Sequence, residues 1–192
     1  LSRRQRQMCI RDRSDEAVDI VLGNNMKINI VDVLEEYFKD NSRDDYVLDI
    51  NNKETTYEEL KIDKVTEHTR AYIKIQDGCN QFCSYCIIPY TRGRIRSRPA
   101  IDIVDEVKRL ALNGYKEIVL TGIHLSSYGK DTGKETLLDV IKLVHEVDGI
   151  ERIRLGSLEP RIVTDEFVSE ISKLYKLCLL YTSDAADDLI GV

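Results

Sequence analysis

Apolar residues from residue 70 onward alternate between strand-like runs and helix-like spacing. Short apolar runs predict three strands, and an amphipathic stretch after each run predicts a helix. The predicted strands cover residues 71–75, 117–120 and 152–155, and the predicted helices cover residues 101–113, 136–147 and a stretch that Thr164 caps. Helices of this length between strands favour parallel pairing with right-handed crossovers. Three such units do not close a barrel, so the pattern predicts an α/β fold that forms part of a larger sheet or barrel.

The spacing of apolar residues within these helices also predicts which side chains face the core. We expect the first two helices to end at Gly114 and Gly149. The expected inward residues are Ile103, Val107, Leu110 and Ala111 in the first helix, Leu137, Leu138, Ile141 and Val144 in the second, and Phe167, Val168, Ile171 and Leu174 in the third.

The sequence before residue 70 has a weaker pattern. Apolar stretches at residues 18–23 and 46–50 predict strands, and the spacing over residues 26–38 predicts an amphipathic helix between them. Residues 51–68 are polar and have no clear period, which is typical of a linker between domains.

The two ends of the chain differ from the rest. Residues 1–13 and 177–192 have no helix or strand period and resemble translated sequencing adapters, so we exclude them from the fold prediction as non-native segments. A basic targeting arm and an acidic tail are the alternative interpretation. The whole chain has a formal net charge of −6, of which the first segment carries +4 and the last carries −3. The 163 residues between them therefore have a net charge of −7.

Composition excludes several classes of protein. Of the 192 residues, 42% are hydrophobic and 32% are charged, which is not the composition of a disordered or collagen-like chain. The net negative charge excludes a general polycation that coats nucleic acid. No apolar run approaches the roughly 18–20 residues that span a membrane, and we expect a cytoplasmic protein.

Three of the five cysteines lie within eight residues, in the order Cys79-Asn-Gln-Phe-Cys83-Ser-Tyr-Cys86. A structural zinc site needs four protein ligands, and no nearby cysteine or histidine completes one. Three cysteines instead fit a 4Fe–4S cluster that leaves one iron open to a ligand. The loop follows the first predicted strand, where β/α folds place their chemistry. Zinc with a distant fourth ligand and three structural cysteines are the alternatives that the spacing leaves open.

The three cysteines, with Tyr85 just before the last, resemble the signature of the radical S-adenosylmethionine (SAM) enzymes. The resemblance implies that the open iron binds the amino and carboxylate groups of SAM. One electron from the cluster would then cleave a sulfur–carbon bond and yield a 5′-deoxyadenosyl radical, while the protein positions the cofactor and excludes water.

The surrounding sequence resembles the methylthiotransferases of that superfamily, through RAYIKIQDGC at residues 70–79 and CIIPYTRGRIRSR at residues 86–98. The similarity implies that residues 14–62 are the remnant of a Rossmann-like α/β amino-terminal domain. It implies that residues 63–176 are the first half of a radical SAM (β/α) barrel. Family members hold a second 4Fe–4S cluster on three cysteines of the amino-terminal domain, and residues 14–62 contain none. We therefore expect the parent protein to be an enzyme and this chain to be inactive alone.

Two further segments resemble one branch of this family, LTGIHLSSYG at residues 120–129 and RIRLGSLEP at residues 152–160. They imply that the parent protein adds a methylthio group to C2 of N6-threonylcarbamoyladenosine, next to the anticodon of a tRNA. The alternatives are methylthiotransferases for isopentenyladenosine in tRNA or for a ribosomal-protein aspartate, and a non-catalytic zinc- or iron-binding module. The implied partners are tRNA, SAM and an electron donor, without a membrane, and we expect a monomer.

Residues after the second and third predicted strands are expected on the same rim as the cysteines. The resemblance implies that these strand ends contact SAM, which assigns Gly122, Ser157 and Glu159, together with Tyr85 near the adenine. His124 lies on the same rim, and a loop histidine with a backbone partner is the favoured interpretation for it.

Arginines alternate over seven residues just after the cysteine loop, at Arg92, Arg94, Arg96 and Arg98. Such a strip is a candidate contact for tRNA phosphates. A solvated loop whose arginines pair with neighbouring acids is the equally weighted alternative.

Overall fold

The computed structural model describes residues 17–24, 26–40, 45–46, 57–58 and 70–178. The chain divides into two compact units, which are described separately. One unit comprises Leu1–Leu60 with Gly78–Arg94, and the other comprises Lys61–Asp77 with Ile95–Val192. In the described part of the chain, no helix is long and apolar enough to cross a membrane.

The first unit contains a small β-α-β arrangement. Strand β1 (Val21–Leu22) pairs in parallel with β2 (Asp45–Tyr46), and the chain between them forms η1 (Lys27–Asn29) and α2 (Ile30–Asp40). The predicted strand–helix–strand order is confirmed here, although part of the second predicted strand and most of the predicted linker lie outside the described residues. Glu58 accepts a hydrogen bond from the backbone N–H of Ile28 (2.7 Å) and ties the start of the helical segment to a residue thirty positions later.

The second unit is a four-stranded mixed sheet with the order β4-β3-β5-β6. Strands β3 (Arg70–Asp77), β5 (Glu117–Gly122) and β6 (Arg152–Leu155) are parallel, and β4 (Arg96–Ser97) pairs antiparallel with β3. The three predicted strands are therefore confirmed, and β4 was not predicted. Arg96 and Ser97 are both polar, so they give no apolar run that would predict a strand. So short a strand forms because its backbone pairs with β3.

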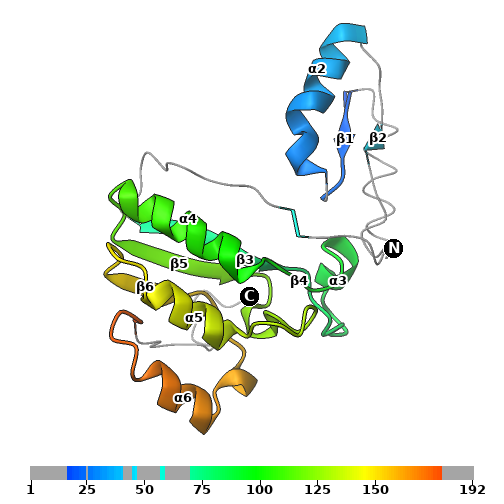
Figure 1. Cartoon of the computed structure of the whole chain (residues 1–192). Coiled ribbons are helices and arrows are strands. Elements are labelled where there is room, and N and C mark those ends of the chain that lie inside the picture. The colour runs from blue at the N-terminus through cyan, green and yellow to red at the C-terminus, as the bar shows by residue number, and fades with distance from the viewer. Residues whose placement is uncertain (1–16, 25, 41–44, 47–56, 59–69, 179–192) are drawn as a thin grey trace, which may run out of the picture. The chain divides into compact units, whose positions relative to one another are not determined.

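Helices α4 (Ala100–Leu112), α5 (Leu137–His145) and α6 (Asp165–Ile171) follow the parallel strands in turn, with short turns η2 (Leu125–Ser127) and η3 (Pro160–Ile162) after β5 and β6. Figure 1 shows α4 and α5 lying along one face of the sheet. The alternation of parallel strands with helices is that of half a (β/α) barrel, as the sequence pattern predicted.

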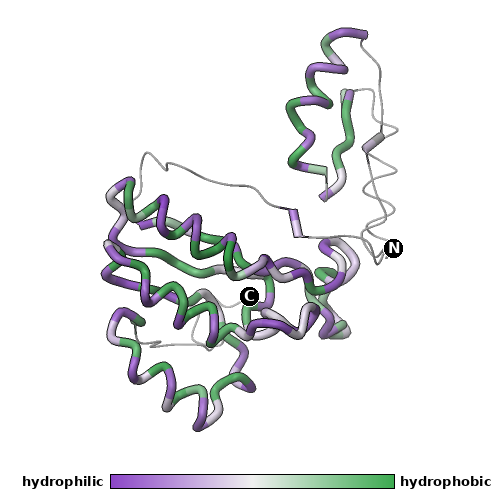
Figure 2. The backbone as a smooth tube through the Cα atoms, in the orientation of Figure 1, coloured by the Kyte–Doolittle hydropathy of each residue, from purple (hydrophilic) through white to green (hydrophobic). Residues whose placement is uncertain are grey.

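One continuous hydrophobic core lies between the sheet and these helices. Alternate residues of each strand point into it, because successive side chains of a strand face opposite sides. Figure 2 shows the apolar stripes of α4 and α5 and the apolar strands beneath them. The core residues with no measurable exposure include Ile73, Ile75, Ile103, Val107, Ile118, Leu120, Val140, Ile141, Val144 and Ile153.

The predicted helix faces are confirmed in α4 and α5 and need one correction in α6. Thr164 does cap α6, accepting a hydrogen bond from the Phe167 backbone N–H (3.2 Å), and Phe167 is buried. Val168, however, is 44% exposed. A helix of only seven residues presents a single fully buried position, and the next residue lies about 100° further around the helix.

Two residues of the end segment join the sheet. Leu177 forms an isolated parallel bridge with Ile153 of β6 and packs against the core. The backbone N–H of Cys178 donates to the Ile153 carbonyl (2.8 Å). The predicted boundary at residue 177 thus falls at a residue that extends the parallel sheet, and residues 179–192 lie outside the described part.

A buried carboxylate lies among arginines at the amino-terminal ends of the parallel strands. Glu117, at the start of β5, is held by the Nε atoms of Arg154 (2.7 Å) and Arg152 (3.1 Å) on β6 and of Arg70 (3.6 Å) on β3. The hydrogen bond from Arg154, reinforced by the three positive charges, lowers the pKa of Glu117 below its ordinary value. This ion cluster ties the three parallel strands together at their amino ends.

Two isoleucines of α4 provide a matched test of the core. Ile103 has no exposed surface and Ile101 is 65% exposed. We expect Ile103→Ala to lower the free energy of unfolding by about 2–5 kcal/mol, because it leaves a cavity. Ile101→Ala should change it by about 0.5 kcal/mol or less. Denaturant titration followed by circular dichroism measures both, and equal losses would contradict the core described here.

The Glu117 cluster predicts a pH dependence of stability. A carboxyl whose pKa is lowered in the folded state stabilises the fold above the pKa of the unfolded chain, and this contribution is lost as pH falls through the folded pKa. We expect Glu117→Gln to reduce the free energy of unfolding at pH 7 by about 1–3 kcal/mol. It should also flatten the fall in stability below pH 4.5. The exposed Glu151→Gln controls for the change in net charge, and a pH profile identical to that of the original chain in Glu117→Gln would refute the assignment.

Candidate functional site

The cysteine-containing segment joins the end of β3 to β4 and is closed at its base. Asp77 pairs with Arg96 and Gln76 pairs with Ser97 in the β3–β4 ladder. Within the segment, the Cys79 N–H donates to the Gly93 carbonyl (3.1 Å). Gly78 has φ +73°, and a Cβ there would lie 1.9 Å from the Arg94 carbonyl oxygen. Only glycine allows the two limbs of the loop to meet this closely, so residues 78–95, the cysteine loop, form a closed excursion from the sheet.

Phe82 organises the interior of the cysteine loop. Its φ of 49° is the one positive value among the described non-glycine residues. Its ring makes an edge contact with Tyr90 (5.5 Å between centroids), and the Arg94 guanidinium lies 4.5 Å from the ring centroid. Tyr90 belongs to the short helix α3 (Ile88–Thr91). A strained backbone held by an aromatic and a cation–π contact is typical of a segment whose conformation serves a ligand.

All three cysteines of the loop are free thiols, and they differ in exposure. Cys79 is buried, Cys86 is half-buried and Cys83 is exposed. A tight turn links the last two, since the Cys86 N–H donates to the Cys83 carbonyl (2.9 Å). Within the described ranges, no three His, Cys, Asp or Glu side chains are grouped closely enough to hold a metal ion. The convergence of the three thiolates on one point therefore stays a prediction.

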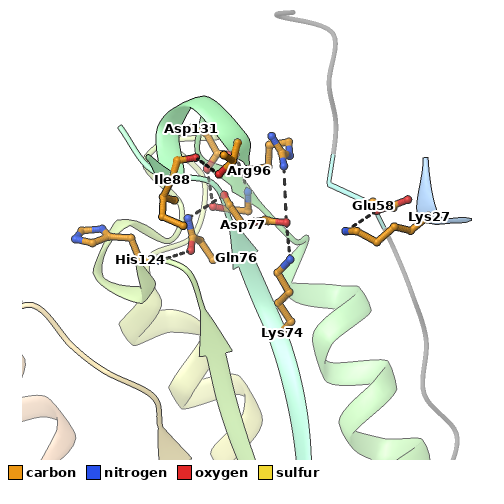
Figure 3. Close-up of polar contacts among 11 residues, drawn as sticks. Lys27, Glu58, Lys74, Gln76, Asp77, Ile88, Arg96, His124 and Asp131 are labelled. Atoms are coloured by element: carbon orange, nitrogen blue, oxygen red, sulfur yellow. Dashed lines mark hydrogen bonds and ion pairs between the residues drawn. The ribbon is translucent and has the colours of Figure 1, made fainter. Parts of the chain in front are cut away.

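The parallel strands β3, β5 and β6 end at the same edge, where their following residues form a polar cluster. Gln76 is fully buried there, donating to the Asp77 carbonyl (2.9 Å) and accepting from the backbone N–H of His124 (2.8 Å), as Figure 3 shows. A Cβ on Gly122 would lie 2.9 Å from the Gln76 Oε1 atom. Gly122 therefore makes room for the side chain that links β3 to the loop after β5.

His124 and Glu159 form the centre of this edge. The His124 Nε2 lies 3.0 Å from the Glu159 Oε2, and its Nδ1 contacts the Ser127 hydroxyl. Glu159 also pairs with the Arg161 Nε (2.8 Å), and its backbone N–H donates to the Ser126 hydroxyl (2.9 Å). The expectation of a backbone partner for the His124 side chain was wrong, because both ring nitrogens have side-chain partners. The half-buried His124 ring thus links the residues after β5 to the carboxylate after β6.

The other residues assigned to SAM lie in accessible positions. Ser157 is exposed, and the Tyr85 side chain is 91% exposed. Gln76, Ser126 and Ser127 were missed by the sequence reasoning. A buried glutamine at the end of an apolar strand, directly before the glycine and the first cysteine, was a signal that could have identified Gln76.

Burial and pairing divide the four alternating arginines between the two interpretations: Arg96 and Arg98 pair with neighbouring acids, while contact of Arg92 and Arg94 with RNA stays a prediction. Arg94 is exposed and Arg92 half-buried, but Arg96 and Arg98 are only 5% and 2% exposed. Arg96 lies 3.8 Å from the Asp77 carboxylate beside the end of β3 (Figure 3), and Arg98 pairs with the buried Glu106 of α4. β4 carries the chain into the sheet at these positions, and buried charges require such partners. Arg96 and Arg98 are therefore not RNA-contacting residues in this structure.

The sequence of this chain is similar to that of a known superfamily and of two groups of tRNA-modifying enzymes. Residues 73–183 match the family model of the Radical SAM superfamily. The tRNA-2-methylthio-N(6)-dimethylallyladenosine synthase of Clostridium botulinum (strain Loch Maree / Type A3) is 42% identical over 163 residues, which are 84% of this chain and 35% of that protein. The threonylcarbamoyladenosine tRNA methylthiotransferase MtaB of Bacillus subtilis (strain 168) is 38% identical over 161 residues, which are 83% of this chain and 36% of that protein. The chain thus spans about a third of the length of these curated relatives.

One solved structure also aligns, that of the radical S-adenosylmethionine methyltransferase TsrM from Kitasatospora setae with cobalamin and a [4Fe-4S] cluster bound. The alignment has a TM-score of 0.44 and 19% sequence identity, over 56% of this chain and 21% of that chain. The assignment of family rests on the sequence match instead. That match begins within β3, covers more than half of the chain and includes the three cysteines with β5 and β6, and the chain belongs to the radical SAM superfamily.

Proposed function

We propose that this chain is the central segment of a tRNA methylthiotransferase that acts on N6-threonylcarbamoyladenosine next to the anticodon. The observation that carries the proposal is a loop with three free thiols at the carboxyl end of β3, in a superfamily member whose relatives are named as tRNA methylthiotransferases. The superfamily implies a 4Fe–4S cluster and SAM as cofactors.

Cys79, Cys83 and Cys86 would hold the cluster, and the chemistry of this donor set fits. Fe–S clusters are bound by cysteine thiolates, and the three thiols lie within eight residues without a disulfide. When bound, the cluster supplies the electron that cleaves SAM. Three ligands leave the fourth iron for the amino and carboxylate groups of SAM, as the family resemblance implies.

The residues of the sheet edge would bind and orient SAM. Glu159 is half-buried, and its carboxylate is suited to accept hydrogen bonds from the amino or ribose groups of the cofactor. Ser157 is exposed, and its hydroxyl could bind the cofactor. Gly122 has no side chain and leaves space beside Gln76 at the end of β5. Tyr85, exposed in the cysteine loop, would pack near the adenine. The His124 ring contacts both Glu159 and Ser127 and would help to orient the Glu159 carboxylate.

The substrate and partners follow from the same proposal. Arg94, which is exposed, and Arg92, which is half-buried, would contact tRNA phosphates. Such contacts carry no sequence information but add affinity. An electron donor must reduce the cluster, and a second 4Fe–4S cluster would belong to a part of the protein outside this chain. A monomer acting on tRNA in the cytoplasm is the simplest form of this function.

The amino-terminal unit would be the remnant of a Rossmann-like α/β domain. Its parallel β1–β2 pair with α2 between them supports this, since such a β-α-β unit is the building block of doubly wound folds.

A second candidate substrate has its own support. The relative from Clostridium botulinum, 42% identical, is named for dimethylallyladenosine, and the one from Bacillus subtilis, 38% identical, for threonylcarbamoyladenosine. We favour threonylcarbamoyladenosine because two segments resemble that branch of the family: LTGIHLSSYG, which begins at the end of β5, and RIRLGSLEP, which begins with β6.

The cluster assignment predicts a selective loss of iron. After anaerobic reconstitution with iron and sulfide, we expect about four irons per chain, and cleavage of SAM once the cluster is reduced. Cys83→Ala should abolish both while the helical content stays intact. Cys178→Ala removes a free cysteine outside the loop and should change neither. Unchanged iron in Cys83→Ala, or tight binding of a single zinc with no iron in the original chain, would refute the cluster.

The substrate assignment predicts one modified nucleoside. The full-length protein that contains this segment should be expressed in a strain that lacks its own tRNA methylthiotransferases. Mass spectrometry of tRNA nucleosides should then show a methylthio group on N6-threonylcarbamoyladenosine. A methylthio group on isopentenyladenosine alone would establish the second candidate, and absence of both products would overturn the tRNA function.

A further inference from the structure

The strand that receives the chain from the cysteine loop has little support from the sheet itself. β4 has two residues and lies at one end of the strand order, so among the described strands its one partner is β3. The ladder is extended by one further bond, from the Arg98 N–H to the Ile75 carbonyl (2.9 Å). Such a short edge strand is weakly held by its backbone alone, and its position depends on contacts from elsewhere.

Those contacts come from the loop after η2. The carboxylate of Asp131 accepts two hydrogen bonds from Ser97 of β4, one from its backbone N–H (2.8 Å) and one from its hydroxyl (2.5 Å). The Ser97 hydroxyl in turn accepts from the Gly129 N–H (2.8 Å). The buried Tyr128 hydroxyl donates to the Arg98 carbonyl (2.5 Å). Residues 128–131 therefore hold the chain at Ser97, in β4, and at Arg98, directly after it. Figure 3 shows Asp131 and Arg96 beside the end of β3.

The loop that makes these contacts is rigid in its own right. Gly129 has φ +80°, and a Cβ there would lie 1.8 Å from the Glu135 carbonyl oxygen, so the chain is closely packed at this point. The Gly129 carbonyl accepts from the Gly133 N–H (2.8 Å). Burial raises the pKa of Tyr128, which keeps its hydroxyl protonated as a donor.

The same segment also reaches the SAM edge. His124, Ser126 and Ser127, a few residues before Asp131, contact Glu159 or one another. One stretch of eight residues thus touches the proposed cofactor residue at its beginning and the exit of the cysteine loop at its end.

We propose that Asp131 is a positioning residue for the cysteine loop. By holding Ser97 through two hydrogen bonds, it sets where and in which direction the chain leaves the loop, four residues after Gly93, which bonds the Cys79 backbone. This inference rests on the proposed cluster at Cys79, Cys83 and Cys86. Asp131 touches neither cluster nor substrate and acts through Ser97.

The test compares Asp131→Asn with Asp148→Asn in the reconstituted full chain. The two bonds from Ser97 reach different oxygens of the Asp131 carboxylate. An asparagine has an NH2 donor in place of one of those oxygens, so in this geometry it cannot accept both bonds. Asp148 is another exposed loop aspartate, in the turn between α5 and β6. We expect Asp131→Asn to take up iron but to lose it to a chelator about tenfold faster, the equivalent of one hydrogen bond to a charged group. The electron paramagnetic resonance spectrum of its reduced cluster with SAM should be broadened. Asp148→Asn should match the original chain in both measurements.

Further variants separate positioning from general stability. Asp131→Glu keeps the carboxylate and should recover part of the slow iron loss, while Ser97→Ala removes one of the two bonds and should accelerate it. If Asp131→Asn fails to fold, Ser97→Ala carries the same comparison. A lower free energy of unfolding with unchanged iron loss and an unchanged spectrum would overturn the inference and leave Asp131 a purely structural residue. An original chain that takes up no cluster would instead overturn the proposed function, and the inference with it.

Discussion

The closure of the cysteine loop at its base is the constraint on which the rest of this molecule depends. The chain leaves the sheet after Asp77, carries three cysteines, and returns at Arg96, opposite the residue that it left. The return is possible because Gly78 has no Cβ and the Arg94 carbonyl can approach it. The first cysteine follows the carboxyl end of β3 by two residues, and parallel β/α folds carry their functional residues after such strand ends.

Buried polar contacts at both edges of the sheet have different roles. At the amino edge, Glu117 binds arginines from two strands and stabilises the parallel arrangement. At the carboxyl edge, Gln76, His124 and Glu159 are linked across three strand ends, and the carboxylate remains partly accessible. In the first cluster the carboxylate is paired with arginines of the fold, whereas in the second the partly accessible carboxylate can accept further hydrogen bonds from a ligand. This division corresponds to the separation of stability from chemistry in barrels of this kind.

The arginines after the cysteine loop illustrate why a charge pattern is a poor guide to a surface. In the sequence they form one alternating strip in an acidic protein. In the structure Arg98 is buried against Glu106, and Arg96 beside Asp77, so half of the strip belongs to the fold. The pairing partners lie 8 and 19 residues away in the sequence, and nothing in the local pattern identifies them.

The sequence by itself determined the alternating strands and helices, the cap at Thr164 and the cysteine motif, because apolar periodicity, capping and ligand spacing are local properties. It also determined the superfamily, since the cysteine motif and its neighbours are read directly from the chain. Only the tertiary structure decided that two polar residues form β4 and that His124 lies between Glu159 and Ser127. It alone brought Asp131 to Ser97, 34 residues earlier in the chain. Each of these depends on side chains that meet through packing and hydrogen bonding across strands, and such partners follow from the path of the whole chain and not from any local window.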